Sequence, residues 1–212
     1  MKMNVIFLFF TGVIIGITGA VIPGPLTLFT VSEVIKSNRF AGLKIMLGHI
    51  ISEFTLVLII FLGLHNFLKS AAVLKITGAI GGLALVVMGV ILFIKHPSVK
   101  SLKAGNDKTI SSGLVMGGIA FSIASPGFIV WWATIGISTV MRSLLYGVIG
   151  IMILLAGHWL ADIAWYWSLS YAVEKGRDHL NDKTYQKIVK SLSILLILLG
   201  IYFICQSFFL TL

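Results

Sequence analysis

Residues 16–29, "GITGAVIPGPLTLF", interrupt the first long apolar run of the chain with two prolines that flank a glycine. Proline lacks a backbone N–H and its ring clashes with the preceding helical turn, while glycine allows the backbone to leave helical geometry. As one continuous helix, the run would be about 48 Å long, more than a bilayer core of about 30 Å. The pattern therefore predicts a bent or broken helix, with freed backbone groups at Pro23, Gly24 and Pro25.

A similar break recurs in the second half of the chain. Residues 117–130, "GGIAFSIASPGFIV", form another apolar, glycine-bearing run that is interrupted at Ser125, Pro126 and Gly127. In a membrane, unpaired backbone is tolerated only against protein or water. A single break is adequately explained as a proline kink that relieves packing. Two breaks in matching positions instead favour a substrate site or hinge, with Trp131 and Trp132 as candidates for lining its cavity.

Two further pairs of segments follow the breaks in the same order. The first pair is "GHIISEF" and "GHWLADI", residues 48–54 and 157–163, and the second pair is "MGVILFI" and "LGIYFI", residues 88–94 and 199–204. These ordered matches predict an internal repeat with three membrane spans in each half. Because three is an odd number, the second half enters the membrane in the opposite direction. Inverted repeats of this kind are common among secondary transporters.

The composition places most of the chain in lipid. Its 212 residues are 58% hydrophobic and 11% charged, with a mean hydropathy of +1.06, whereas a soluble domain has about 25% charged residues. The net charge of +9 lies mainly in short gaps between apolar runs. That distribution is typical of lysines facing anionic lipid and argues against nucleic-acid binding. The single cysteine, Cys205, excludes an intrachain disulfide and a four-cysteine metal site.

Six apolar runs are long enough to cross a bilayer. We expect spans at roughly 4–35, 42–64, 73–94, 110–138, 145–171 and 189–210. The connections on one side contain 12 Lys and Arg residues, and those on the other side contain 4. Because cytoplasmic loops are enriched in these residues, both termini are predicted to lie outside the cytoplasm. The first 20 residues also fit a cleaved signal peptide, but their apolar run exceeds the usual length of about 7–15 residues, so we expect a retained span.

Two polar pairs lie deep inside predicted spans. His49 and Glu53 are four residues apart and share a helix face, and His158 and Asp162 have the same spacing. A charge at a helix centre costs at least about 2.5–3.5 kcal/mol, so these side chains are expected to face a polar interior. Three interpretations remain open. The pairs form a coupling site for a proton or ammonium group, a site for a divalent metal, or contacts that only stabilise helix packing.

Three stretches of the sequence are similar to the lysine-exporter (LysE/RhtB) family of amino-acid efflux proteins. They are "GAVIPGPLTLF", "AGLKIMLGHIISE" and "SIASPGFIVWWATIG", residues 19–29, 41–53 and 122–136. The resemblance covers essentially the whole chain, and Pro-Gly-Pro is its most specific motif. Family members more often have Asn-Pro where Ser125-Pro126 stands here, and many have Asp in place of Glu53. The resemblance implies a secondary transporter that exports amino acids or related small solutes, driven by a proton or cation gradient.

These observations together predict an all-α integral membrane protein of the prokaryotic cytoplasmic membrane. Its six transmembrane helices are expected to form a 3+3 inverted-topology repeat, with the first helix of each half broken at Pro-Gly. The halves are residues 1–95 and 110–212, joined by a cytoplasmic linker at 96–109. The expected partners are a small solute and the lipid bilayer, with a homo-oligomer as an open alternative.

The sequence predicts no cofactor and no enzymatic activity. The chain has no His-Glu-x-x-His motif, nucleophile elbow or phosphate loop. The rival functions are a divalent-cation exporter that uses the same His and acid pairs, and a purely structural membrane subunit. The first rival is consistent with relatives of similar topology that handle metal ions.

Overall fold

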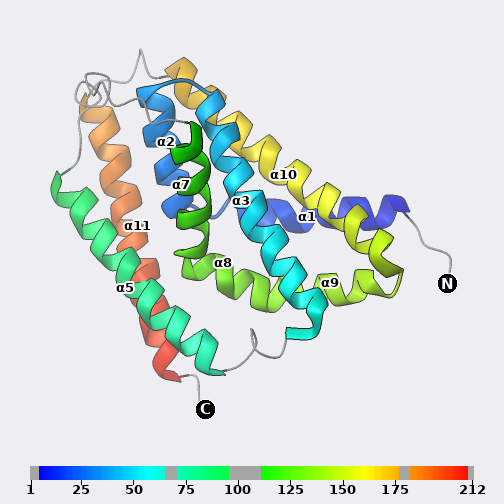
Figure 1. Cartoon of the computed structure of the whole chain (residues 1–212). Helices are drawn as coiled ribbons and strands as arrows, with labels where there is room; N and C mark the ends of the chain where they lie inside the picture. Colours follow the sequence, from blue (N-terminus) through cyan, green and yellow to red (C-terminus); the bar gives the residue numbers. More distant parts are fainter. Residues whose placement is uncertain (1–4, 65–70, 96–110, 177–181, 210–212) are drawn as a thin grey trace.

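The computed structural model describes residues 5–64, 71–95, 111–176 and 182–209, and all elements in these ranges are helical (Figure 1). The predicted linker at 96–109 lies outside the described residues. The elements of the first half are α1 (Val5–Ala20), α2 (Pro25–Lys36), α3 (Phe40–Ile59), the π-helical segment η1 (Ile60–Leu64) and α5 (Ala71–Lys95). Those of the second half are α7 (Ser111–Ile123), α8 (Pro126–Trp131), the π-helical segment η2 (Trp132–Gly136), α9 (Ile137–Leu144), α10 (Gly147–Gly176) and α11 (Asp182–Phe209).

The first predicted break separates α1 from α2, whose axes differ by 80°. The chain leaves α1 after Ala20, and Gly24 is extended, with φ −152° and ψ −167°. Pro25 then occupies the first position of α2, where its missing N–H removes no helical hydrogen bond and its fixed φ suits the helix. The sequence Pro-Gly-Pro therefore ends one helix and starts the next.

The second predicted break separates α7 from α8 in a similar way. Ser125 is extended, with φ −82° and ψ 114°, and Pro126 occupies the first position of α8. Pro25 and Pro126 thus both occupy the first position of a helix, whereas the Pro-Gly dipeptides from which the sequence predicts a repeat are Pro23-Gly24 and Pro126-Gly127. Beyond α8 the chain continues through η2 and α9 and turns at Gly147, where φ is +72°.

The helices pack mainly in three pairs, each of which joins one half of the chain to the other. Helix α1 packs along α10, α3 along α7, and α5 along α11. Figure 1 shows α5 beside α11 at one flank and α7 between α2 and α3, in agreement with the contacts.

Glycines allow two of these helix pairs to approach closely. A methyl group placed on Gly48 of α3 would collide with the carbonyl oxygen of Val115 in α7. One placed on Gly157 of α10 would collide with the carbonyl oxygen of Phe9 in α1. Small residues at such contacts are typical of membrane helices, whose association depends on close packing rather than on the exclusion of water. Both glycines directly precede the predicted histidines, so they fix the depth of His49 and His158 between the helices.

The distribution of side chains on α3 suits a lipid environment. Leu47, Ile51, Phe54 and Leu58 are exposed on one side of this helix, whereas Glu53 is buried. This is the reverse of a helix in a soluble protein, which turns its charged residues to solvent. The helix therefore presents its apolar face outward and its carboxyl group to the interior.

By length and composition, four helical stretches within the described residues are able to cross a membrane: Phe40–Gly63, Pro126–Leu144, Gly147–Gly176 and Gln186–Phe208. The bent pair of α1 and α2 makes a fifth if it counts as one span. Gly78–Ile94 and Ser111–Ile123 are apolar but shorter. The described part of the chain is all-helical and has several helices suited to crossing a membrane. The six separate spans predicted from the sequence are not confirmed by this criterion.

Candidate functional site

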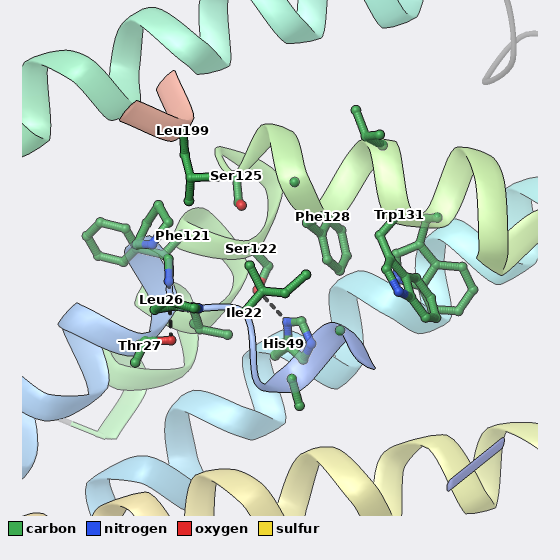
Figure 2. A pocket seen from close by; sticks show the side chains of 18 of the residues that line it. Ile22, Leu26, Thr27, His49, Phe121, Ser122, Ser125, Phe128, Trp131 and Leu199 are labelled. Carbon is green, nitrogen blue, oxygen red and sulfur yellow. Dashed lines mark hydrogen bonds between the residues drawn. The ribbon is translucent and has the colours of Figure 1, made fainter. Parts of the chain in front are cut away.

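A cavity of about 370 Å³ lies where the two breaks meet the middles of α3, α10 and α11 (Figure 2). Eleven of the twelve residues predicted from the sequence line it: Pro23, Gly24, Pro25, His49, Glu53, Ser125, Gly127, Trp131, Trp132, His158 and Asp162. The exception is Pro126, which is fully buried against Gly81 of α5. The structure thus brings together residues that are separated by more than a hundred positions in the sequence.

The two predicted His and acid pairs form one cluster across α3 and α10. Within α3, His49 Nε2 lies 3.2 Å from Glu53 Oε1. Between the helices, His158 Nε2 lies 3.0 Å from the same Glu53 oxygen. Within α10, His158 Nε2 lies 3.4 Å from Asp162 Oδ2. A single carboxylate oxygen therefore receives an imidazole from each half of the chain.

The cluster is buried, and the oxygens of its two carboxyl groups are only partly hydrogen-bonded. Glu53 and Asp162 are each 2% exposed, and His158 is 3% exposed. Glu53 Oε2 and Asp162 Oδ2 have no hydrogen-bond partner within the described part of the chain. Neither Lys nor Arg is among the described residues that line the cavity. Because an unpaired buried charge costs several kcal/mol, these oxygens require a proton, an imidazolium or a bound cation.

Ser122 of α7 fixes where one proton of the cluster lies. Its hydroxyl donates to the carbonyl oxygen of Gly118 at 2.6 Å and lies 2.7 Å from His49 Nδ1. A hydroxyl has one hydrogen, so with this pairing His49 Nδ1–H is the donor to Ser122. His49 Nε2 then faces Glu53 either as the N–H of an imidazolium or as the acceptor of a carboxylic acid O–H. In both forms one proton lies between these two side chains.

A second polar link joins α10 to the first break. The hydroxyl of Tyr166 lies 3.3 Å from Thr27 Oγ1, and Thr27 Oγ1 accepts the backbone N–H of Gly24 at 3.4 Å. Tyr166 is 4% exposed and lies one helical turn beyond Asp162 on the same face of α10. Figure 2 shows Thr27 at one end of the cavity and His49 beside Ser122.

Aromatic rings surround the histidines. The ring centroid of His158 lies 5.2 Å from that of Trp131 and 5.6 Å from that of Trp132. The ring centroid of His49 lies 5.4 Å from that of Phe128. Trp132 is buried in the core at 3% exposure, whereas Trp131 also donates its Nε1–H to Thr18 of α1 at 3.3 Å. Both tryptophans line the cavity.

Three polar residues of the site, Ser122, Thr27 and Tyr166, were not identified from the sequence. A hydroxyl in an apolar helix is commonly satisfied by a backbone carbonyl of the preceding turn, so its presence alone predicts no site. The sequence does contain a pattern that indicates Tyr166. His158, Asp162 and Tyr166 follow one another at intervals of four residues and therefore share one face of a helix. For Thr27 and Ser122 the signal was their closeness to the breaks.

Comparison with known proteins agrees with this architecture. The family described as LysE type translocator matches residues 17–207, which include both breaks and all four members of the His and acid cluster. No curated protein and no solved structure matches the chain. A family match over nearly the whole length identifies the chain as a multi-pass membrane transport protein that belongs to the LysE type translocator family.

Proposed function

We propose that the protein is a secondary transporter that exports amino acids or related small solutes across the prokaryotic cytoplasmic membrane in exchange for protons. The observation that carries this proposal is the buried cluster of Glu53, Asp162, His49 and His158, which faces a cavity at two helix breaks. The carboxyl groups are only partly hydrogen-bonded, and no Lys or Arg is among the described residues that line the cavity. Such a site suits a ligand that brings positive charge, and an ammonium group and a proton are both such ligands.

The proposed exchange follows from competition for the same oxygens. When the cavity faces the cytoplasm, the acids release a proton and bind the ammonium group of the substrate. When it faces the outside, the ammonium leaves and a proton returns to the carboxyl group. The histidines take up or relay that proton, because His49 and His158 both contact Glu53 Oε1. One substrate then leaves the cell as protons enter.

The helix contacts support an inverted repeat as the basis of alternating access. If α1, α2, α3 and α5 correspond to α7, α8, α10 and α11, the α1–α10 contact corresponds to the α7–α3 contact, and the α5–α11 pair corresponds to itself. Transport would proceed by rocking one half against the other around the cavity. The proposed correspondence is not exact. Gly12 of α1 contacts α10, and Gly118 of α7 contacts α3. Along the chain, Gly12 lies farther from Pro25 than Gly118 lies from Pro126.

The distribution of basic residues supports the proposed orientation. Lys36 and Lys175 lie in the last turns of α2 and α10, at the side assigned to the cytoplasm. Arg142 lies in the last turn of α9, at the opposite side. In the same orientation, both termini lie outside the cytoplasm. The proposed partners are a small solute and the bilayer, and a homo-oligomer is compatible with both.

An efflux assay tests the proposed function. The purified protein is placed in proteoliposomes loaded with a mixture of labelled amino acids, and the outside is made acidic. We expect the proton gradient to accelerate efflux and a protonophore to abolish the acceleration. Protein-free liposomes provide the control. Efflux at the protein-free rate for every amino acid would contradict the proposal.

The second candidate function is export of a divalent metal ion. One observation favours it: ligand atoms of His49, Glu53 and Asp162 all lie within 4.8 Å of one another, and imidazole with carboxylate suits first-row transition metals. Equilibrium dialysis of purified protein with Zn²⁺ or Co²⁺ separates the candidates. A metal exporter binds the ion stoichiometrically and loses it on His49→Ala, whereas an amino-acid carrier shows no stoichiometric metal binding.

A further inference from the structure

The cavity has a polar side and an apolar side. This division indicates which kind of amino acid the cavity accepts. The His and acid cluster, Ser122 and Tyr166 occupy the polar side. The apolar side is formed by α7, α8 and α11, and its members include Phe121, Phe128, Leu196, Leu199 and Phe203. In Figure 2, Leu199 lies on the far side of the cavity from Thr27 and His49, whereas the ring of Phe128 lies next to His49, with 5.4 Å between the centroids.

The polar side offers complementary groups for the two charges of a zwitterion. Glu53 Oε2 and Asp162 Oδ2, which have no hydrogen bond within the described residues, suit an ammonium group. The N-terminus of α2, which begins at Pro25, carries the positive end of the helix dipole and suits a carboxylate. Tyr166 contacts Thr27 in the first turn of α2 and lies one turn beyond Asp162 on α10. The two groups of the polar side are therefore connected through neighbouring turns of α10, and both line the same cavity.

The apolar side has no charged partner for a third group. Neither Lys nor Arg lines the cavity in the described ranges, and its acids are those already assigned to the ammonium. A charged side chain would therefore lose its water without finding a counter-ion there, which is costly. A small side chain would leave the rings of Phe121 and Phe128 uncovered. At about 370 Å³ the cavity falls within the usual range for small-molecule sites of about 300–1,000 Å³.

We infer that the substrate is an α-amino acid with a bulky apolar or aromatic side chain, rather than a cationic or small one. The inference rests on the proposed function and specifies its substrate class. In the bound state the ammonium lies between Glu53 and Asp162, the carboxylate lies at the start of α2, and the side chain packs against α8 and α11.

A ligand panel tests this specificity with the unaltered protein. The melting temperature of the detergent-purified protein is titrated with phenylalanine, leucine, alanine, lysine and glutamate, because a ligand that prefers the native state raises it. We expect phenylalanine and leucine to bind at least about tenfold more tightly than alanine or lysine. Phenethylamine and 3-phenylpropionate, which lack the carboxylate and the ammonium respectively, are expected to bind more weakly than phenylalanine.

A pair of neighbouring variants locates the selective contact. Leu199 lines the cavity, whereas Leu198 is 58% exposed on the outside of α11. We expect Leu199→Ala to weaken phenylalanine binding by about tenfold and Leu198→Ala to leave it unchanged.

The outcomes separate the inferred substrate class from the proposed export function. Tighter binding of alanine, lysine or glutamate than of phenylalanine would overturn the substrate class and leave amino-acid export in place. An equal effect of the two leucine variants would overturn the role of α11 in selectivity. Absence of binding by every amino acid, together with efflux at the protein-free rate, would overturn the proposed function as well.

Discussion

Glu53 is the residue on which the polar contacts of the cavity converge. Its Oε1 atom lies within 3.2 Å of His49 Nε2 and 3.0 Å of His158 Nε2, while its Oε2 atom has no hydrogen-bond partner in the described chain. One oxygen therefore holds α3 and α10 together, and the other is left without a hydrogen bond inside the protein. In low-dielectric surroundings such a network is stable only when its charges and protons balance. Removing or adding one positive charge at this point should therefore change the preferred arrangement of the two helices.

Substitution of Tyr166 tests the contribution of a single polar contact beside the cavity. Tyr166→Phe removes the contact with Thr27, which itself accepts the N–H of Gly24. We expect it to lower the free energy of unfolding by about 1 kcal/mol and to slow substrate efflux, because the start of α2 is less firmly held. Tyr171→Phe is the matched control, since Tyr171 lies on the same helix, is 42% exposed and is not among the described residues that line the cavity. Equal efflux rates for Tyr166→Phe and Tyr171→Phe would contradict a role for the Tyr166 link.

At the scale of elements, the breaks and glycine contacts fix the position of the polar residues. Pro25 and Pro126 start α2 and α8 at the edge of the cavity, and Gly48 and Gly157 bring α3 against α7 and α10 against α1. These contacts hold the helices that bring His49 and His158 to the same oxygen of Glu53. Local backbone chemistry at the breaks and close packing beside them thus produce one site from two halves.

The glycine contact is tested by comparing two alanine substitutions. Gly48→Ala places a methyl group against the carbonyl oxygen of Val115, and Gly176→Ala places one where no atom lies within 4 Å. We expect Gly48→Ala to destabilise the protein by about 1–3 kcal/mol through overpacking, and Gly176→Ala to leave the melting temperature nearly unchanged. Similar melting temperatures for both variants would show that α3 and α7 are not packed so closely.

Part of the fold and of the site is predictable from the sequence, and the rest depends on how the helices pack. The proline breaks and the buried acids were predictable, because helix breakers and ionisable groups are costly in an apolar run. The spacing of His49 from Glu53 and of His158 from Asp162 gave the face of each helix. It did not give the contact between His158 and Glu53, which depends on α3 and α10 meeting. That contact arises from packing between distant segments, as do the positions of Ser122 and Thr27.

At the scale of the whole molecule, one end carries features of a membrane interface. Arg39 lies 5.4–5.6 Å from the ring centroids of Phe40, Trp167 and Tyr171, and its backbone N–H donates to Glu174 at 3.0 Å. Aromatic residues beside basic ones are typical of the boundary between hydrocarbon and water. Together with the excess of Lys and Arg in the connections at this end, they support its assignment to the cytoplasmic side.

Cysteine labelling tests this orientation. Cys205→Ala removes the only native thiol, and Lys175→Cys or Arg142→Cys is then added singly. In intact cells, a membrane-impermeant maleimide should label Arg142→Cys and leave Lys175→Cys unlabelled until the cells are opened. Labelling of both sites from the outside would contradict the proposed arrangement of the spans.

The most direct test of the central claim is gradient-driven efflux from proteoliposomes with both cavity acids neutralised. The Glu53→Gln, Asp162→Asn double variant is compared with Glu174→Gln, which alters a carboxyl group that contacts Arg39 outside the cavity. We predict that an inward proton gradient no longer accelerates efflux in the double variant, while Glu174→Gln responds as the unaltered protein does. Full acceleration in a correctly folded double variant would contradict coupling through Glu53 and Asp162.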